Sequence, residues 1–221
     1  MLSALIDLVL SRTCVGCGAE AEALCRDCSA HDPVETAVAG LLVRSAAAYD
    51  GAVRAALIAY KEHGRRDLAR PLARMLAAVL DDAAVLDDAV LAAPPSLDDA
   101  VLAGTAVLVP VPSSAAATRA RGGDHMRRLC RATRRPTVAA LSLTRDVADS
   151  AGLTAPARYR NLAGAMTARP PTDPGRRDVV IVDDIVTSGA TLTEAARALR
   201  AAGWRPIGAA TVAATPRLAG R

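Results

Sequence analysis

The fold of this chain is decided by one stretch, Val179-Val-Ile-Val-Asp183-Asp184-Ile-Val-Thr187-Ser188-Gly189-Ala190-Thr191. It begins as a run of β-branched residues, passes through two acids into a short turn of hydroxyl residues and glycine, and is followed by the helix-forming sequence Leu192-Thr-Glu-Ala-Ala-Arg-Ala-Leu199. The pattern predicts a strand, a tight turn and a helix. Thr191 and Glu194 have the spacing of a capping box, so we expect the helix to begin at the turn. Its unpaired N–H groups and positive dipole end would then face any ligand that the turn holds.

The turn has the chemistry of an anion site. It consists of hydroxyl residues and small residues that let the backbone approach a ligand, namely Thr187, Ser188, Gly189, Ala190 and Thr191. We predict that this segment binds a monophosphate. Asp183 and Asp184, set back from it, can accept hydrogen bonds from vicinal ribose hydroxyls, so the ligand is expected to contain ribose 5-phosphate. A Walker A loop is excluded because the turn has no lysine, and a dinucleotide fingerprint because it has one glycine. The alternative is an ordinary strand-to-helix turn.

Further apolar runs predict an α/β fold with a parallel sheet. We expect strands over residues 41–48, 106–112, 137–141, 178–182 and 207–212, and helices over 52–60 and 67–80. Continuous β-branched runs separated by helical patterns are typical of strands buried on both faces. Ligands of such sheets bind at the carboxyl ends of the strands, which is where the 187–191 turn falls. The three Asp-Asp pairs within residues 81–102 are predicted to cap or solvate short helices.

Four of the five cysteines form two closely spaced pairs, Cys14-x2-Cys17 and Cys25-x2-Cys28. Two such pairs can place four thiolates around one tetrahedral ion, so the pattern predicts structural Zn²⁺ bound by Cys14, Cys17, Cys25 and Cys28. His31 could substitute as a ligand. Cys130, in an arginine-rich helical segment, is expected to be a small buried residue. We therefore predict two units, an N-terminal helix and zinc ribbon over 1–35 and a main domain over 36–221.

Composition limits the remaining function classes. The chain has 221 residues, 52% hydrophobic and 2% aromatic, with a net charge of +4. This apolar content excludes intrinsic disorder, while the small charge excess and few aromatics allow at most weak contact with single-stranded DNA. No apolar stretch reaches the roughly 18 residues of a membrane span. Residues 1–12 have helical spacing and contain Asp7, so we expect an amphipathic helix rather than a signal peptide, no membrane insertion and a cytoplasmic location.

The 179–191 stretch resembles the 5-phosphoribosyl 1-diphosphate (PRPP) binding motif of type I phosphoribosyltransferases. The whole chain resembles the ComF family, phosphoribosyltransferase-like proteins associated with DNA uptake in competent bacteria. The similarity covers the four cysteines and the stretches "YDGAVRAALIAYKEHG" at 49–64, "VPVPSSAAATRARGG" at 109–123 and "GLTAPARYRNLAGAM" at 152–166. The chain departs from the family at Gly123 and Asp124, where the family has an aromatic residue and Asn, and at Ser150, where it has Gln.

The resemblance implies a type I phosphoribosyltransferase-like sheet flanked by helices, and a reaction in which a nitrogen acceptor displaces diphosphate from PRPP. Asp183 and Asp184 are then the candidate catalytic residues, and Mg²⁺ would enter with PRPP. The diphosphate would bind to cationic and small residues at and after the 110–114 strand end. The candidates are Pro112, Ser113, Arg119, Arg121 and Lys61. Tyr49, Tyr60 and Tyr159 are the aromatic candidates to stack on an acceptor base.

Two functions follow from this resemblance. The first is a phosphoribosyltransferase acting on PRPP and a nitrogen acceptor that the sequence does not identify. The second is a non-catalytic adaptor that senses PRPP or a nucleoside monophosphate and regulates a DNA-uptake helicase. An enzyme needs a closable pocket for a planar acceptor beside the loop, whereas an adaptor does not. We favour the enzyme.

Overall fold

The computed structural model describes residues 13–20, 22–30, 32–81, 107–145, 154–173, 175 and 177–216. The helix predicted over residues 1–12 lies outside this part of the chain, as do His31, Ser150 and all but the first residue of the 81–102 segment. Of the helices described, none is long and apolar enough to cross a membrane.

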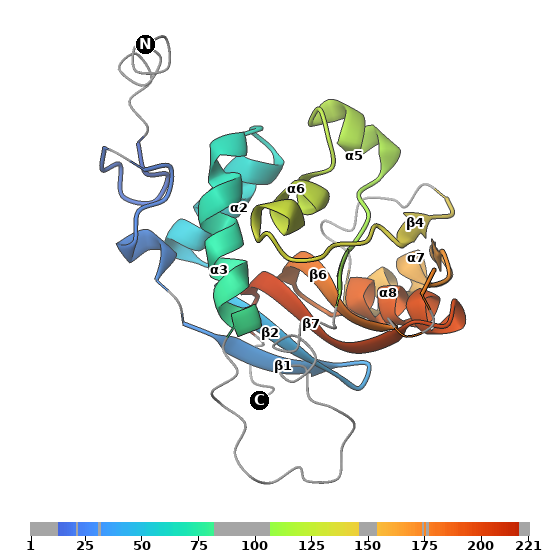
Figure 1. Cartoon of the computed structure of the whole chain (residues 1–221). Helices are drawn as coiled ribbons and strands as arrows, with labels where there is room; N and C mark the ends of the chain where they lie inside the picture. Colours follow the sequence, from blue (N-terminus) through green and yellow to red (C-terminus); the bar gives the residue numbers. More distant parts are fainter. Residues whose placement is uncertain are drawn as a thin grey trace, which may run out of the picture.

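The centre of the molecule is a five-stranded sheet (Figure 1). From one edge to the other its strands are β1 (Val34–Val38), β2 (Leu41–Ala48), β7 (Arg205–Ala214), β6 (Asp178–Val186) and β3 (Val107–Pro110). All neighbours are parallel except β1, which pairs antiparallel with β2. The predicted α/β fold is confirmed. Strand β6 is longer than predicted and includes both aspartates at its carboxyl end.

The antiparallel edge strand β1 was not predicted from the sequence. It joins β2 through Ala39 and Gly40, whose φ angles are both positive, 53° and 74°. Positive φ at both central residues is what a two-residue type I′ hairpin requires, and its usual sequences are Asn-Gly or Asp-Gly. Because Ala-Gly is a weak signal for this turn, the sequence pattern did not indicate the hairpin.

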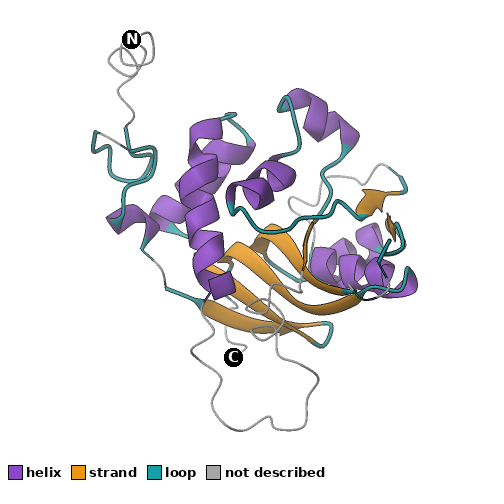
Figure 2. Ribbon diagram, viewed as in Figure 1, coloured by secondary structure: helices purple, strands orange, loops and turns teal. Residues whose placement is uncertain are grey.

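Helices cover both faces of the sheet (Figure 2). On one face, α2 (Gly51–Lys61), α3 (Ala69–Asp81) and α6 (His125–Ala132) pack on Val180 and Val182. On the other, α8 (Ala190–Ala201) packs on Val179 and Ile181. Successive residues of β6 therefore pack into opposite cores, which is why the strand is apolar at every position from Val179 to Val182.

The segment 137–141, predicted as a strand of this sheet, does not form one. Thr137 makes an isolated parallel bridge to Leu108, with the Val138 N–H donating to Leu108 O at 2.9 Å. The chain then leaves the sheet, and strand β4 (Leu141–Leu143) pairs antiparallel with β5 (Met166–Ala168). The prediction was wrong here because the backbone groups from Ala140 onward bond to the β5 strand and its flanks instead.

Trp204 fixes the two-stranded β4–β5 sheet to the main one. It follows α8, is 8% exposed and packs in the core that α8 shares with Val179 and Ile181. Its indole Nε1–H donates to the carbonyl of Arg169, just beyond β5, at 2.7 Å. A buried indole with its N–H satisfied is the arrangement expected for a core residue.

Candidate functional site

A cavity of about 600 Å³ lies at the carboxyl ends of β3 and β6. Of the residues predicted for the site, it brings together Lys61, Pro112, Ser113, Arg121, Asp183, Asp184, Thr187, Ser188, Ala190 and Thr191. Two predicted residues do not line it. Arg119 is exposed near the end of α5 (Ala115–Ala120), and Gly189 is buried between the loop and α8. The carboxyl-end location agrees with the general rule for parallel sheets.

Gly189 sets the start of α8. It is the N-cap residue with a φ of +81°, in the left-handed region that favours glycine, and α8 begins at Ala190. Its carbonyl accepts both the backbone N–H and the hydroxyl of Thr193, each at 2.9 Å. The predicted capping box is wrong, because the helix starts before Thr191 and no side chain caps it.

Glu194 has a different role from the one its spacing suggested. It is 5% exposed and accepts the backbone N–H of Met166 in β5 at 2.9 Å. Arg197 pairs with the same carboxylate at 2.7 Å and also donates to the Met166 carbonyl at 2.8 Å. Burial by itself would raise the pKa of Glu194, but these hydrogen bonds lower it. The acid therefore attaches α8 to the β4–β5 pair.

Asp184 is the centre of a buried charge network. Its Oδ2 lies 2.7 Å from Lys61 Nζ, at the end of α2, and 3.3 Å from His125 Nε2, at the start of α6. Burial alone would raise the pKa of Asp184, but the His125 hydrogen bond and the Lys61 charge hold it well below its usual range. Conversely, burial alone would lower the pKa of Lys61 and the Asp184 carboxylate raises it. At neutral pH this is an ion pair.

The pKa of Asp183 is shifted in the opposite direction from that of its neighbour. Burial, reinforced by the negative charge of Asp184, raises its pKa to about 8. Its Oδ1 accepts the backbone N–H of Asp184 at 2.9 Å. The pKa values of the two adjacent carboxyls are therefore shifted in opposite directions, the kind of split that separates the roles of paired acids.

His125 is a site residue that the sequence did not reveal. It is 6% exposed, lines the cavity and places Nδ1 3.0 Å from both Ser113 Oγ and Arg121 Nη1. From the arginine-rich helical segment that follows His125, the sequence pattern singled out only Cys130. The available signal was Asp124, whose carboxylate accepts the N–H groups of Met126 and Arg127 and so caps α6 one residue before the histidine.

Helix α7 (Ala155–Leu162) lies against the predicted phosphate loop. Arg158 Nη1 donates to Thr187 Oγ1 at 3.1 Å, and the Tyr159 hydroxyl donates to the Ser188 carbonyl at 2.8 Å. Tyr159 is 40% exposed, whereas Tyr60 is 3% exposed in the helical core. Of the three tyrosines considered for stacking, Tyr159 is thus the exposed one that contacts the loop.

Comparison with known families agrees with this geometry. Residues 137–221 match the family model of the phosphoribosyl transferase domain. This part of the chain is therefore similar to a phosphoribosyl transferase domain. The match contains the Asp183-Asp184 step, the 187–191 loop and α8, whereas Lys61, Ser113 and His125 lie before it and reach the same cavity through the fold. No curated protein matches the chain.

The four predicted zinc ligands form one cluster. The sulfur atoms of Cys14, Cys17, Cys25 and Cys28 lie within 4.8 Å of one another, and those of Cys17 and Cys25 are 3.7 Å apart. A tetrahedral ion with Zn–S bonds of about 2.3 Å needs sulfurs about 3.8 Å apart. The cluster therefore fits Zn²⁺.

The electrostatics of the cluster favour a bound cation. Burial alone would raise the pKa of the Cys14 thiol, but backbone N–H groups, including those of Cys25 and Gly16 at 3.4 Å, lower it to about 6. Burial and the neighbouring sulfurs raise the pKa of Cys28 to about 12. A divalent ion stabilises all four thiolates at once, because the ion's own charge dominates such a site.

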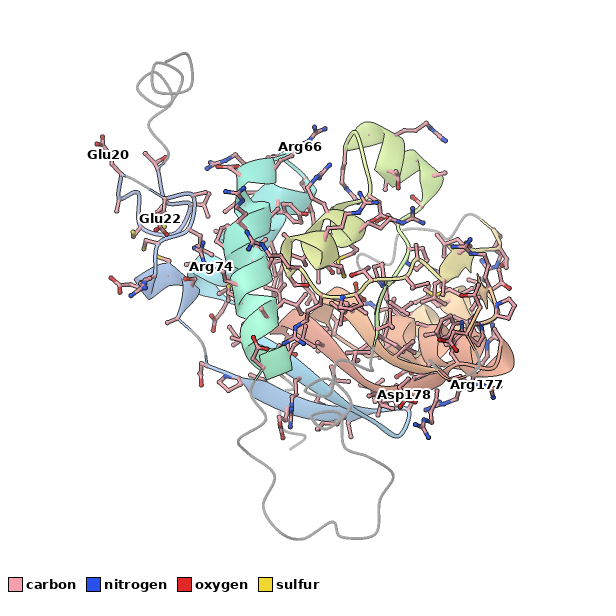
Figure 3. All side chains as sticks on the ribbon, in the orientation of Figure 1. Glu20, Glu22, Arg66, Arg74, Arg177 and Asp178 are labelled. Carbon is pink, nitrogen blue, oxygen red and sulfur yellow. The ribbon has the colours of Figure 1, made fainter. Side chains whose placement is uncertain are left out.

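The cysteine cluster is packed on the helical face of the domain. Leu24 is fully buried in the core shared with α2 and α3, and a Cβ added at Gly16 would lie 2.5 Å from Cβ of Ala52 in α2. Glu22 also lies 3.6 Å from Arg74 of α3, a pair visible in Figure 3. This packing gives the cluster a structural position, away from the cavity.

Proposed function

We propose that this chain is a phosphoribosyltransferase that binds PRPP in the cavity and transfers its phosphoribosyl group to a nitrogen acceptor. One observation carries the proposal. The 187–191 loop and two buried acids line a single cavity together with Lys61 and Arg121, and residues 137–221 match the phosphoribosyl transferase family model.

The charges of the lining residues indicate which part of PRPP each group of residues would bind. The 5-phosphate would bind to the 187–191 loop, where hydroxyls and the first N–H groups of α8 can donate. The ribose hydroxyls would bind Asp183 and Asp184, the first able to donate and the second to accept a hydrogen bond. The diphosphate would lie toward Ser113 and Arg121, because a guanidinium offers paired donors to phosphate oxygens.

Magnesium fits the chemistry of this donor set, since it prefers oxygen ligands and retains several waters. The carboxyl oxygens of Asp183 and Asp184 would hold it, and the ion would neutralise charge on the leaving diphosphate. The chain's own residues position the ribose and balance negative charge through Lys61 and Arg121. Positioning and charge complementarity are the main sources of catalysis when the protein forms no covalent bond to the substrate.

Titration calorimetry with PRPP and Mg²⁺ tests ligand binding. Replacing both acids, Asp183→Asn with Asp184→Asn, should weaken binding about tenfold or more, because each charge-assisted hydrogen bond is worth about 1.5–3 kcal/mol. Asp178→Asn is the matched control. Asp178 lies at the other end of β6, paired with Arg205. Equal affinity for wild type and the double variant would remove the acids from the site.

Transfer is tested separately, by incubating the protein with PRPP, Mg²⁺ and a panel of nucleobases and measuring diphosphate release. Release that depends on one acceptor supports the enzyme. Binding of PRPP without release across the panel would instead support the adaptor that senses a nucleotide.

Within this proposal the chain is a ComF-like protein of the cytoplasm, with a DNA-uptake helicase as its partner. The four-cysteine cluster ahead of a phosphoribosyl transferase domain supports that assignment. Co-purification of the helicase with wild-type chain, and its loss with a cluster variant such as Cys25→Ser, is the expected result.

A further inference from the structure

The His125 side chain joins three elements of the cavity. Its Nδ1 lies 3.0 Å from Ser113 Oγ, just beyond β3, and 3.0 Å from Arg121 Nη1, just beyond α5. Its Nε2 lies 3.3 Å from Oδ2 of Asp184 on β6. Its own backbone is held by Tyr60 in α2, whose hydroxyl donates to the His125 carbonyl at 2.8 Å. The ring is thus fixed from both ends.

These partners determine where the imidazole carries its proton. A guanidinium can only donate, so the Nδ1 atom that faces Arg121 must accept. The proton of the neutral ring is then on Nε2, where the Asp184 carboxylate accepts it. Ser113 can also donate to Nδ1, and the arrangement leaves no atom of the ring mismatched.

Two donors compete for one acceptor at Nδ1. A ring nitrogen offers a single in-plane lone pair, yet the Ser113 hydroxyl and the Arg121 guanidinium both lie 3.0 Å from it. An anion that binds Arg121 would draw its guanidinium away and leave Nδ1 to Ser113. The ring would keep its orientation, and with it the Nε2–H bond to Asp184.

We propose that His125 is a positioning residue that couples the diphosphate side of the cavity to its ribose side, an inference that rests on the proposed function. The ring holds Asp184 for the ribose hydroxyls and releases Arg121 to the diphosphate while Ser113 replaces it. His125 therefore increases the affinity for a ligand with both ribose and diphosphate groups more than the affinity for ribose 5-phosphate, which lacks the diphosphate.

Calorimetry with two ligands separates this role from a merely structural one. We expect His125→Leu to weaken Mg²⁺–PRPP binding about tenfold or more and ribose 5-phosphate binding less than threefold. His125→Gln should restore most of the loss, because its amide both accepts and donates. His63→Leu, at an exposed position after α2, is the matched control. Equal losses for the two ligands, or none for PRPP, would overturn the proposal.

A second measurement needs no ligand. Nitrogen-15 NMR of the full chain should show the His125 ring as the neutral Nε2–H tautomer, assigned by the signals that vanish in His125→Gln. Asp184→Asn should keep this tautomer, because Arg121 still donates to Nδ1 and the asparagine oxygen can accept from Nε2–H. An Nδ1–H tautomer in wild type would overturn the inference. If wild type binds neither ligand, the proposed function fails and the coupling fails with it, whereas loss of the coupling alone leaves PRPP binding intact.

Discussion

Val38, the last residue of β1, packs against the backbone of Gly189 in the predicted phosphate loop. A Cβ atom added at Gly189 would lie 2.7 Å from Cγ1 and 2.8 Å from Cγ2 of Val38. The β1–β2 hairpin at the edge of the sheet therefore packs against the loop. This contact could not be predicted from the sequence, because the hairpin and the loop are far apart in the chain.

Gly189→Ala is expected to destabilise the fold for two reasons. The positive φ costs about 1–2 kcal/mol for a residue with a side chain, and overpacking against Val38 adds about 1–3 kcal/mol. Urea unfolding measures the sum. Gly164→Ala is the matched control, since its φ is +69° but nothing lies within 4 Å of the added Cβ. A second change, Val38→Ala, should recover the overpacking part, and equal losses at the two glycines would contradict this account.

Asp183→Asn is expected to change how stability depends on pH. The pKa of Asp183 is raised to about 8 in the folded protein, whereas an unfolded aspartate has a pKa of about 3.9. The stability that protonation of Asp183 contributes is fully present below the unfolded pKa. This stability is lost as the pH rises through the folded pKa, because over that range the unfolded state binds fewer protons than the folded state. The free energy of unfolding of Asp183→Asn, relative to that of wild type, should therefore rise by more than about 1.4 kcal/mol between about pH 5 and pH 8.

Asp184→Asn is expected to change the pH dependence of stability in the opposite direction. The pKa of Asp184 is lowered, so its stabilising contribution is present above the ordinary value and is lost only as the pH falls through the lowered one. This variant should be less stable than wild type at both pH values. Parallel pH profiles for the two variants would show that the neighbouring carboxyls do not differ in charge.

The purified protein should contain one equivalent of zinc, measured by elemental analysis. Cys25→Ser should lose the metal and make residues 13–30 sensitive to protease, because the binding free energy of such a site stabilises its fold. The sheet should retain its far-ultraviolet circular dichroism. Cys130→Ala is the matched control, since Cys130 is fully buried and lies outside the cluster. Free thiols at all four positions with no metal would contradict the prediction.

Glu194→Gln should destabilise the protein by about 1.5–3 kcal/mol, the worth of hydrogen bonds to a charged group. The loss should be concentrated at β4 and β5, because the carboxylate holds the Met166 N–H and Arg197. Hydrogen exchange of the Met166 amide reports it directly. Arg200→Ala, an exposed position on the same helix, should leave that amide unchanged. Uniform loosening of the whole sheet would contradict a local attachment role.

Local patterns predicted the elements that depend on local sequence. Apolar runs located β2, β3, β6 and β7, and the periodicity of residues 52–60 and 67–80 located α2 and α3. The 137–141 run has the same composition as a buried strand. The backbone of its first residues nevertheless bonds only to Leu108 of β3, and Leu141 pairs with β5, a partner that only the tertiary structure supplies.

The site was predictable where its residues are contiguous. Asp183, Asp184 and the loop lie in one stretch, and the pairing of small and hydroxyl residues identified them. His125 was missed because its function depends on Asp184, which is 59 positions away, and on Ser113. Glu194 was misread for a related reason, since the left-handed backbone of Gly189 moves the helix start and turns the acid toward β5.

The chain contains one tryptophan and no phenylalanine, which makes Trp204 a built-in optical reporter of a single junction. Its indole is shielded in the α8 core and bonded to the Arg169 carbonyl beyond β5. Separation of the β4–β5 pair from the sheet would break that bond and admit water to the ring, shifting the fluorescence to longer wavelength. Emission would then follow this one docking event, whether or not the cysteine cluster at the opposite end of the chain has opened.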